Sequence, residues 1–584
     1  MTFLATTALH SFWNTNRKIS FLGPWCLLSK DEHIWKFLDY EIMPSPWNDR
    51  DAYYKAGKYT YRLYQYLLDL ISEYLNNIHD TRYTRRFWQI IIGPWLLNFI
   101  EVFYDRYYCL KKAFRRYFPV ETILLDEKSY ITPQDTRDCC ELYCNDLYNL
   151  QLYSQIIRHF GISGPTKKYV RKDSTYIEHK GFQHFIEKCL YVISRYIASR
   201  KRIILWDMHL SSRYILKYIL SSNFLASPVL FGNYFTSNYP IIADSRRLNL
   251  AKLPTFDEFT GILINNFPYN FPALYLEGFR DFLEKALSWF KDVPRVVMSA
   301  VGWGRNERLK FLAAYWAEKG TVLCGCQHGG VYGTGKWVPD EMHEIEISEN
   351  YYTWGWEVDN KMSVKPLPNP RISKLRYRKI KYDLKGYFLF VGTCHPRYLY
   401  RLFSCPVGEM FDEYIEWRNI FLRILTPVNR KRILIRLYRA DYDRAEKNRV
   451  LREFPDVRFD NYKRKFLSRL ERSLIAVIDH PVTSMLEGLA MNHPTILFWN
   501  PRYWELREEA KPFFEELTNA GIWHKNPKSA AQFLNEVSND VMSWWHNSKT
   551  QFAREKFVNQ FAVGNRNWSK IWWSEMKKIL KEAV

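Results

Sequence analysis

Hydrophobic and polar positions follow two kinds of pattern along this chain. From about residue 51 to residue 160, leucine and aromatic residues recur three and four positions apart, which is the spacing of one face of an α-helix. Long helices are therefore predicted over residues 51–78, 86–118 and 143–160. After residue 200, short apolar runs alternate with helical segments, which is the pattern of parallel sheets built from βαβ units.

The middle of the chain predicts a first set of strands. Ile203–Trp206 and Val296–Ser299 are short apolar runs typical of buried strands, and a further strand is predicted over residues 321–324. A helix over residues 306–319, with Gly320 as its C-cap, would join the last two strands. An earlier strand is predicted over residues 18–22, where a Gly-Pro turn closes it.

A second set of strands begins at Tyr387–Val391. Further strands are predicted over residues 432–438, 474–478 and 494–499, with a helix over residues 411–425. Together the two sets predict an α/β protein of two Rossmann-like domains that face each other across a cleft, with added N-terminal helices and a C-terminal helical segment.

Prolines mark the predicted domain boundary. The segment KPLPNP, residues 365–370, precedes a basic tract and separates the two sets of strands. We therefore expect a first domain over residues 1–366, with a helical insertion at about residues 51–160, and a second domain over residues 380–539. Helices over residues 540–584 are expected to return to the first domain.

The segment 477–504, VIDHPVTSMLEGLAMNHPTILFWNPRYW, carries the strongest functional signal. Its first strand breaks at Asp479 and His480, and Thr483 or Ser484 is expected to cap a helix with Glu487 in its first turn. Free N–H groups and the positive end of the helix dipole bind anions there, typically a phosphate. We predict a nucleotide site in which Glu487 accepts hydrogen bonds from a ribose and the Asp-His turn contacts substrate. An ordinary capping arrangement explains the same spacing.

A glycine-rich turn after a predicted strand supplies a candidate base. Glycines beside His328 allow close approach of substrate, and an imidazole with a pKa of about 6.5 suits proton removal from a hydroxyl. We predict His328 and Glu346 as catalytic residues, with Gln327, Gly329 and Gly330 in contact with substrate. A histidine bonded to a turn carbonyl and a solvated acidic face are the alternative interpretations.

Arg436 lies near the end of the strand predicted over residues 432–438. Its guanidinium could neutralise a nucleotide phosphate through a bidentate contact, and a solvated surface arginine is the alternative.

Composition narrows the class of partner. The chain of 584 residues has 84 Lys and Arg against 62 Asp and Glu, a formal net charge of +22, which favours anionic partners. No zinc-finger spacing or RNA-recognition motif is present, so nucleic-acid binding has charge alone behind it and no nucleic-acid partner is expected. No P-loop or metal-binding motif is found either, and neither a metal nor another cofactor is predicted.

Cysteine spacing and hydropathy bear on the compartment. The ten cysteines fit neither a disulfide framework nor a zinc site, which is typical of reduced thiols in the cytoplasm. The N-terminus lacks the charged start of a signal peptide. The longest apolar run, residues 87–103, is interrupted by polar residues, so we expect a buried helix, with an interfacial membrane segment as the alternative. The protein is expected in the cytoplasm, at most peripheral to the inner face of the inner membrane.

With these residues in view, the chain resembles transferases encoded in bacterial O-antigen and other surface-polysaccharide gene clusters. The likeness extends over nearly the whole length. It rests on segments rich in Trp, Gly and Pro: FLGPWC (21–26), PWNDR (46–50), RRFWQIIIGPWL (85–96), QHGGVYG (327–333), YYTWGWE (351–357), IRLYRADY (435–442) and LEGLAMNHPTILFWNP (486–501).

That family is in turn similar to GT-B glycosyltransferases, namely capsule transferases that use CMP-activated ulosonic acids such as Kdo, and teichoic-acid polyol-phosphate transferases. These enzymes share a His-Gly turn and a Ser/Thr-x-x-Glu helix start. By that resemblance His328 is the base or acceptor-orienting residue, and Thr483, Ser484 and Glu487 form the nucleotide-binding helix start. Arg436 stands where such enzymes carry a His-Pro or basic turn, whereas this strand ends Arg-Leu-Tyr.

The resemblance implies a metal-independent glycosyltransferase with a nucleotide-sugar donor, CMP-sugar favoured, and a surface-polysaccharide or lipid-linked glycan acceptor. Peripheral contact with an anionic membrane would suit that acceptor. The alternatives are a polyol-phosphate or phosphosugar transferase of the same fold, a nucleic-acid-binding protein, and a non-catalytic assembly protein.

Overall fold

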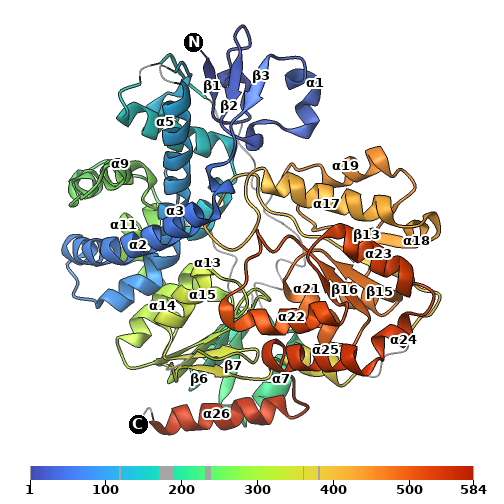
Figure 1. Cartoon of the computed structure of the whole chain (residues 1–584). Coiled ribbons are helices and arrows are strands. Elements are labelled where there is room, and N and C mark those ends of the chain that lie inside the picture. Colours follow the sequence, from blue (N-terminus) through green and yellow to red (C-terminus); the bar gives the residue numbers. More distant parts are fainter. Residues whose placement is uncertain are drawn as a thin grey trace.

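The computed structural model describes residues 2–117, 120–162, 164–169, 190, 192–230, 238–358, 361–378 and 382–582. Two six-stranded parallel sheets form the centres of its two halves, and helices surround both (Figure 1). This is the α/β, GT-B-like architecture that the sequence predicts, with N-terminal and C-terminal helices added to the two sheets.

The first sheet has the strand order β11-β10-β9-β8-β6-β7. The chain runs from β6 to its neighbour β7 and then returns to β8 on the other side of β6. The carboxyl ends of β6 and β8 therefore border the switch point at which such sheets bind ligands. The strands are β6 Ile203–Trp206, β7 Ala226–Val229, β8 Val296–Ser299, β9 Val322–Cys326, β10 Asn350–Thr353 and β11 Val364–Pro366.

The second sheet has the order β14-β13-β12-β15-β16-β17, and its switch point lies between β12 and β15. The strand β15 is buried at all six positions, as its unbroken apolar run predicts. The strands are β12 Tyr387–Val391, β13 Ile433–Arg436, β14 Arg458–Phe459, β15 Ser473–Ile478, β16 Thr495–Phe498 and β17 Trp523–His524. The proline-rich segment, residues 365–370, includes the end of β11 and the first residue of the helix α16 Pro370–Arg376, which leads to the first strand of the second sheet.

Two long helices, α2 Arg50–His79 and α3 Arg85–Tyr117, pack against each other and against the first half. By length and composition α3 could cross a membrane, yet 89% of its most apolar 18-residue window is buried inside the protein. The helix predicted over residues 143–160 is present as α5 Asp146–His159. It begins later than predicted because the Asn145 side chain accepts hydrogen bonds from the backbone N–H groups of Leu147 and Tyr148 and so caps the helix. A short helix, α4 Thr136–Leu142, precedes it.

A small three-stranded parallel sheet, β1 Phe3–Ala5, β2 Ile19–Phe21 and β3 Tyr40–Ile42, stands apart from the two large ones near the N-terminus (Figure 1). The sequence predicts only the middle strand, since three-residue strands are too short to show a period.

Helices cover both large sheets. At the C-terminus, α26 Trp568–Glu582 packs through Trp572 and Met576 in one hydrophobic cluster with α7 of the first half (Figure 1).

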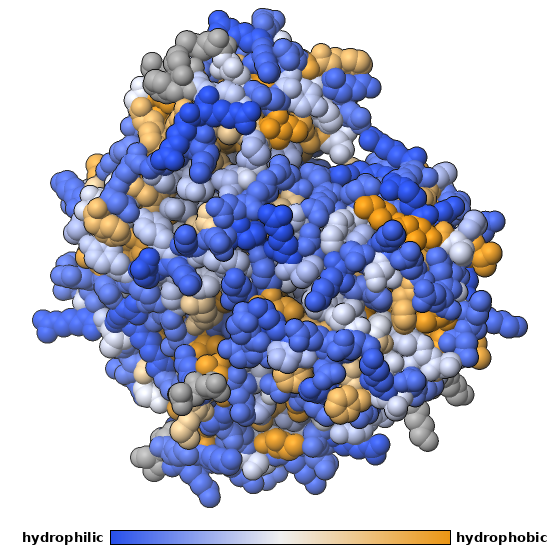
Figure 2. All heavy atoms as spheres, in the orientation of Figure 1, coloured by the Kyte–Doolittle hydropathy of each residue, from blue (hydrophilic) through white to orange (hydrophobic). Residues whose placement is uncertain are grey.

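The face shown in Figure 2 is mostly hydrophilic, with apolar side chains scattered in small groups. The main remaining helices are α7 Ser212–Ser221, α9 Glu258–Asn265, α12 Phe279–Leu287, α14 Glu307–Ala317, α15 Pro339–Ile347, α16 Pro370–Arg376, α17 Met410–Ile424, α19 Glu446–Glu453, α21 Thr483–Ala490, α22 Lys511–Asn519, α23 Pro527–Val537, α24 Val541–Trp545 and α25 Ser548–Phe561.

Candidate functional site

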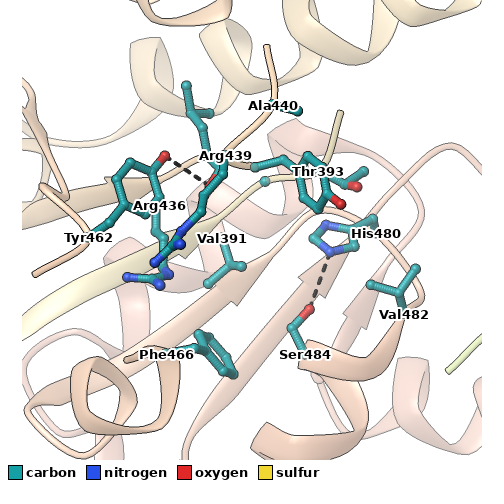
Figure 3. Close-up of a pocket in the computed structure, with 13 residues that line it drawn as sticks. Val391, Thr393, Arg436, Arg439, Ala440, Tyr462, Phe466, His480, Val482 and Ser484 are labelled. Carbon is teal, nitrogen blue, oxygen red and sulfur yellow. Dashed lines mark hydrogen bonds between the residues drawn. The ribbon is translucent and has the colours of Figure 1, made fainter. Parts of the chain in front are cut away.

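A pocket of about 410 Å³ lies at the carboxyl ends of β12, β13 and β15, at the switch point of the second sheet (Figure 3). Arg436, His480 and Ser484, all singled out from the sequence, line it. Apolar side chains such as Val391 and Phe466 form other parts of its wall. Its volume and mixed lining are those of a small-molecule site.

His480 is held by hydrogen bonds on both ring nitrogens. Its Nδ1 lies 2.8 Å from Asp479 Oδ1, and its Nε2 lies 3.2 Å from Ser484 Oγ, as Figure 3 shows for the second contact. An ionised Asp479 can only accept, so Nδ1 carries a proton and Nε2 is turned toward Ser484 and the pocket. The turn thus presents an oriented imidazole to any ligand in the pocket.

A buried arginine lies behind this turn and pairs with Asp479. Arg418, 0% exposed, lies 3.2 Å from Asp479 Oδ2 and 2.7 Å from Glu446 Oε2. The Tyr414 hydroxyl donates to Asp479 Oδ1 at 2.7 Å. Burial disfavours the Arg418 cation, but Tyr414, Glu446 and Asp479 outweigh burial and raise its pKa. The cation therefore balances two buried carboxylates behind His480.

The start of α21 lacks a side-chain cap. The helix begins at Thr483 with Val482 as N-cap and no side-chain cap hydrogen bond, so the expected capping by Thr483 or Ser484 is wrong. The Ser484 hydroxyl lies against His480 instead. Because an apolar N-cap cannot accept from the first N–H groups, this helix end remains suited to an anion.

Glu487 lies on α21 as expected but already has a cationic partner. Its side chain is 3% exposed and lies 2.5 Å from Arg371 Nε on α16. Burial raises the pKa of Glu487 to about 7, and Arg371 opposes that rise. The predicted contact with a ribose would therefore involve a carboxyl group that the protein holds through Arg371.

Arg436 lines the pocket, and its guanidinium is anchored by the protein. It forms an ion pair with Asp460 and donates from Nη1 to the Arg464 carbonyl oxygen at 3.2 Å. Arg439, which the sequence does not single out as a site residue, lines the same pocket, and its guanidinium lies 5.7 Å from the centre of the Tyr462 ring. The run Arg-Leu-Tyr-Arg after the strand end was the available signal, and Arg439 is the second candidate for a phosphate contact.

In the other half, His328 follows β9 and pairs with Glu344. His328 Nε2 lies 3.0 Å from Glu344 Oε1 and 3.0 Å from the Tyr332 hydroxyl. The Tyr351 hydroxyl donates to Glu344 Oε2 at 3.0 Å. With Nε2–H donated to the carboxylate, Nδ1 is the nitrogen left to accept a proton, and the side chain is 26% exposed. The arrangement is that of an oriented general base.

Glu346 does not lie beside His328, so the predicted pair of catalytic residues is not brought together. It accepts from Gln65 Nε2 at 3.0 Å and Gln89 Nε2 at 2.9 Å and also bonds the Tyr61 hydroxyl, which ties α15 to the long helices. An α-helix turns by about 100° per residue, so side chains two positions apart point in nearly opposite directions. Glu344 therefore faces the histidine, and Glu346 faces the opposite way.

Gln327 holds the turn in shape. It is 3% exposed, its Oε1 accepts from Trp354 N at 2.8 Å and Trp356 Nε1 at 2.9 Å, and its Nε2 donates to the Gly329 carbonyl at 2.9 Å. Both polar atoms of the Gln327 side chain therefore have hydrogen-bond partners within the protein. The structure gives this side chain a role in shaping the turn, in place of the predicted contact with substrate.

The two halves of the site touch at Gly330. A Cβ placed on Gly330 would lie 2.4 Å from Thr483 N and 2.5 Å from Val482 C, which real side chains never do. Gly329 has open space, with Tyr332 the nearest neighbour at 3.9 Å. The His328 turn of the first half therefore packs directly on the start of α21 in the second half.

Replacing Gly330 by alanine is expected to push the His328 turn off α21. We expect a loss of about 1–3 kcal/mol in unfolding free energy from overpacking, and a larger loss of transfer activity because the base and the nucleotide site separate. Gly329→Ala is the matched control, since it adds the same methyl group to the same turn where there is room. Denaturant unfolding compares the packing of the two variants, and equal unfolding free energies would contradict the close contact. Nucleotide-release rates of Gly330→Ala and the unmodified protein measure the loss of activity.

His209 is a further histidine near this junction. It follows β6 with a φ of 52°, and Asp207 in the same turn has a φ of 47°, both in the left-handed region that such residues seldom adopt. Partial desolvation, and then His328 and Arg371, lower the pKa of His209. The position of His209 just after a predicted strand is the feature of the sequence that could have identified it as a site residue. Among the described residues, no three His, Cys, Asp or Glu side chains are grouped so that they could hold a metal ion.

Comparison with known proteins gives one family. The family described as LIC12162 family transferase matches residues 2–576, which include both large sheets. No curated protein matches the sequence.

Three solved structures are similar in part. The S. aureus MnaA–UDP co-structure is 9% identical with a TM-score of 0.38 and covers 65% of this chain and 96% of its own. UDP-GlcNAc 2-epimerase from Neisseria meningitidis bound to UDP-GlcNAc is 14% identical with a TM-score of 0.36, and the match covers 64% of this chain and 99% of the epimerase chain. An alpha-glucosyltransferase in complex with UDP and a 13-mer DNA is 14% identical with a TM-score of 0.36, and the match covers 65% of this chain and 99% of the glucosyltransferase chain.

Proposed function

Because this chain belongs to the LIC12162 family of transferases, we propose that it is a glycosyltransferase that moves a sugar from a nucleotide-sugar donor to a hydroxyl of an acceptor glycan. One observation carries the proposal. A histidine–carboxylate pair at a glycine turn packs directly on an uncapped helix start that borders a pocket of nucleotide size.

The donor phosphate would bind at the start of α21. The first N–H groups of the helix face that region and Arg439 lines the same pocket, so both would stabilise the charge that develops on the leaving phosphate. His480 Nε2 also faces the pocket and would donate to the phosphate once it is protonated. Asp479 and Arg418 keep the imidazole in one orientation. Helix dipole and basic side chains suffice for this task, so the transfer is proposed to be independent of a metal.

The acceptor would approach from the His328 side. His328 Nδ1 removes the proton from the acceptor hydroxyl as its oxygen bonds the anomeric carbon, and Glu344 stabilises the imidazolium that forms. The bond between the anomeric carbon and the donor phosphate breaks, and its electrons leave with the nucleotide. With a CMP-ulosonic acid, which we favour as donor, the leaving group is CMP.

We place the reaction at the cytoplasmic face of the inner membrane, with a surface polysaccharide or a lipid-linked glycan as acceptor. The net charge of +22 supports an anionic acceptor or a nearby anionic surface.

A panel of CMP, CDP, UDP, GDP and dTDP in thermal unfolding tests the proposal. A nucleotide at 100 times its dissociation constant stabilises the folded protein by about 2.7 kcal/mol. A response to CMP alone supports a CMP-ulosonate donor, whereas UDP, GDP or dTDP would indicate the corresponding nucleotide sugar. Unchanged unfolding with all five at millimolar concentration would contradict a nucleotide-sugar enzyme.

A further inference from the structure

Arg305 lies at the junction of the two halves and has no acidic partner among the residues that the structure describes. It ends the short helix α13, Gly302–Arg305, just beyond the carboxyl end of β8 and therefore at the switch point of the first sheet. Its side chain is exposed, and it has no hydrogen bond or ion pair with any residue that the structure describes. An arginine in a ligand-binding position with no acidic partner is suited to an anion from outside the protein.

A second arginine, Arg401, lies at the start of α15, the helix that carries Glu344, through its ion pair with Asp340. Its charge interacts with that of Arg305, and burial first and then Arg305 lower the pKa of Arg401. Arg401 pairs with Asp340, its guanidinium stacks 4.4 Å from the centre of the Phe403 ring, and its Nε is buried without a hydrogen-bond partner. Two neighbouring guanidiniums with one carboxylate leave an excess of positive charge.

The arginine pair is close to the candidate base. Tyr332 interacts electrostatically with Arg401, and its hydroxyl lies 3.0 Å from His328 Nε2. Neither Arg305 nor Arg401 lines the nucleotide pocket, which is formed by other residues at the second sheet. An anion at this pair would therefore belong to a molecule that approaches the base from the acceptor side.

A strained loop borders the same place. Tyr442, Asp443 and Ala445 have φ values of 49°, 58° and 51°. Such left-handed residues are strained and persist where the surrounding structure holds them, often at ligand sites. Asp441 Oδ2 accepts from Ala445 N at 2.8 Å and fixes the loop, and Tyr442 lies within electrostatic reach of Arg305.

We propose that Arg305 and Arg401 form an acceptor subsite that binds a phosphate or diphosphate group. Guanidinium forks match phosphate oxygens, and two adjacent forks suit a dianion or a diphosphate better than a single carboxylate. The inference rests on the proposed function, because it assigns the anion to the acceptor of that transfer. The phosphate belongs either to a soluble sugar phosphate or to a lipid diphosphate that carries the glycan.

Titration calorimetry with inorganic pyrophosphate tests the subsite directly. The titration uses the full chain at fixed ionic strength, with the nucleotide pocket saturated by the nucleotide that stabilises the protein most. Arg305→Gln is expected to weaken pyrophosphate binding at least about tenfold, which corresponds to about 1.4 kcal/mol. Arg115→Gln, which removes an exposed arginine charge from α3, is the matched control and is expected to leave binding unchanged. Equal pyrophosphate affinity of Arg305→Gln and the unmodified protein overturns the subsite.

Nucleotide stabilisation of the same variant separates this inference from the proposed function. Arg305→Gln is expected to keep the full nucleotide response. A protein without any nucleotide response contradicts the proposed function, while the pyrophosphate comparison still judges the subsite. Glucose 1-phosphate and vesicles that carry a polyprenyl diphosphate then identify the source. Arg305-dependent binding of either one supports the subsite, and dependence in neither overturns it.

Discussion

Replacing His328 by glutamine is expected to lower the rate of glycosyl transfer by about two to four orders of magnitude, the usual contribution of general-base catalysis. Glutamine keeps a polar side chain in the turn but cannot take the proton of the acceptor hydroxyl. Nucleotide binding is expected to stay unchanged, because the pocket is formed by the second sheet. Nucleotide release in the presence of acceptor measures the rate, and thermal unfolding with nucleotide measures binding.

The matched control is His546→Gln, which removes an exposed histidine near the C-terminal helices. It is expected to retain the full rate. A His328→Gln variant with unchanged transfer would exclude this residue as the base. Simultaneous loss of nucleotide binding would show instead that the variant has disturbed the contact between the turn and α21.

Replacing Arg418 by methionine is expected to cost about 3–5 kcal/mol in unfolding free energy, the usual result of removing one partner from a buried ion pair. The change leaves the Asp479 and Glu446 carboxylates buried without their cation. It also removes the charge behind Asp479, so His480 is expected to lose its fixed orientation and nucleotide binding to weaken. The midpoint of denaturant unfolding and the nucleotide response measure these effects.

Arg423→Met is the control on the same helix, α17. Arg423 is 51% exposed and pairs with Glu453, so its loss is expected to cost no more than about 1 kcal/mol. Adding Glu446→Gln and Asp479→Asn to Arg418→Met is expected to recover part of the stability, because the uncompensated charges are gone. Similar destabilisation by the two arginine variants would contradict the buried charge cluster.

The strands of the two large sheets could be predicted closely from the sequence. The predicted limits of Ile203–Trp206, Val296–Ser299 and Tyr387–Val391 agree with the structure because each is a short apolar run that starts directly after an arginine or a glycine. The strands Phe3–Ala5 and Tyr40–Ile42 could not be found, since three residues show no period. The start of the helix over residues 143–160 was predicted too early because the apolar spacing continues across Asn145, the residue that caps α5.

The candidate site was predictable where strand ends carry polar residues. His328, His480 and Ser484 were found because carboxyl ends of parallel strands bind ligands. The choice between Glu344 and Glu346 depends on the rotation of one helix, which the spacing alone did not fix. Arg305 has no motif, since its importance arises only from the meeting of segments that are far apart in the chain.

The central claim is that a nucleotide-sugar donor binds at the start of α21, opposite His328. A crystal structure with the nucleotide that stabilises the protein most would test it directly. The account predicts the phosphate against the first N–H groups of α21, beside His480 and Ser484, with the position of the sugar on the side of His328. A nucleotide bound elsewhere in the protein, with the start of α21 unoccupied, would contradict it.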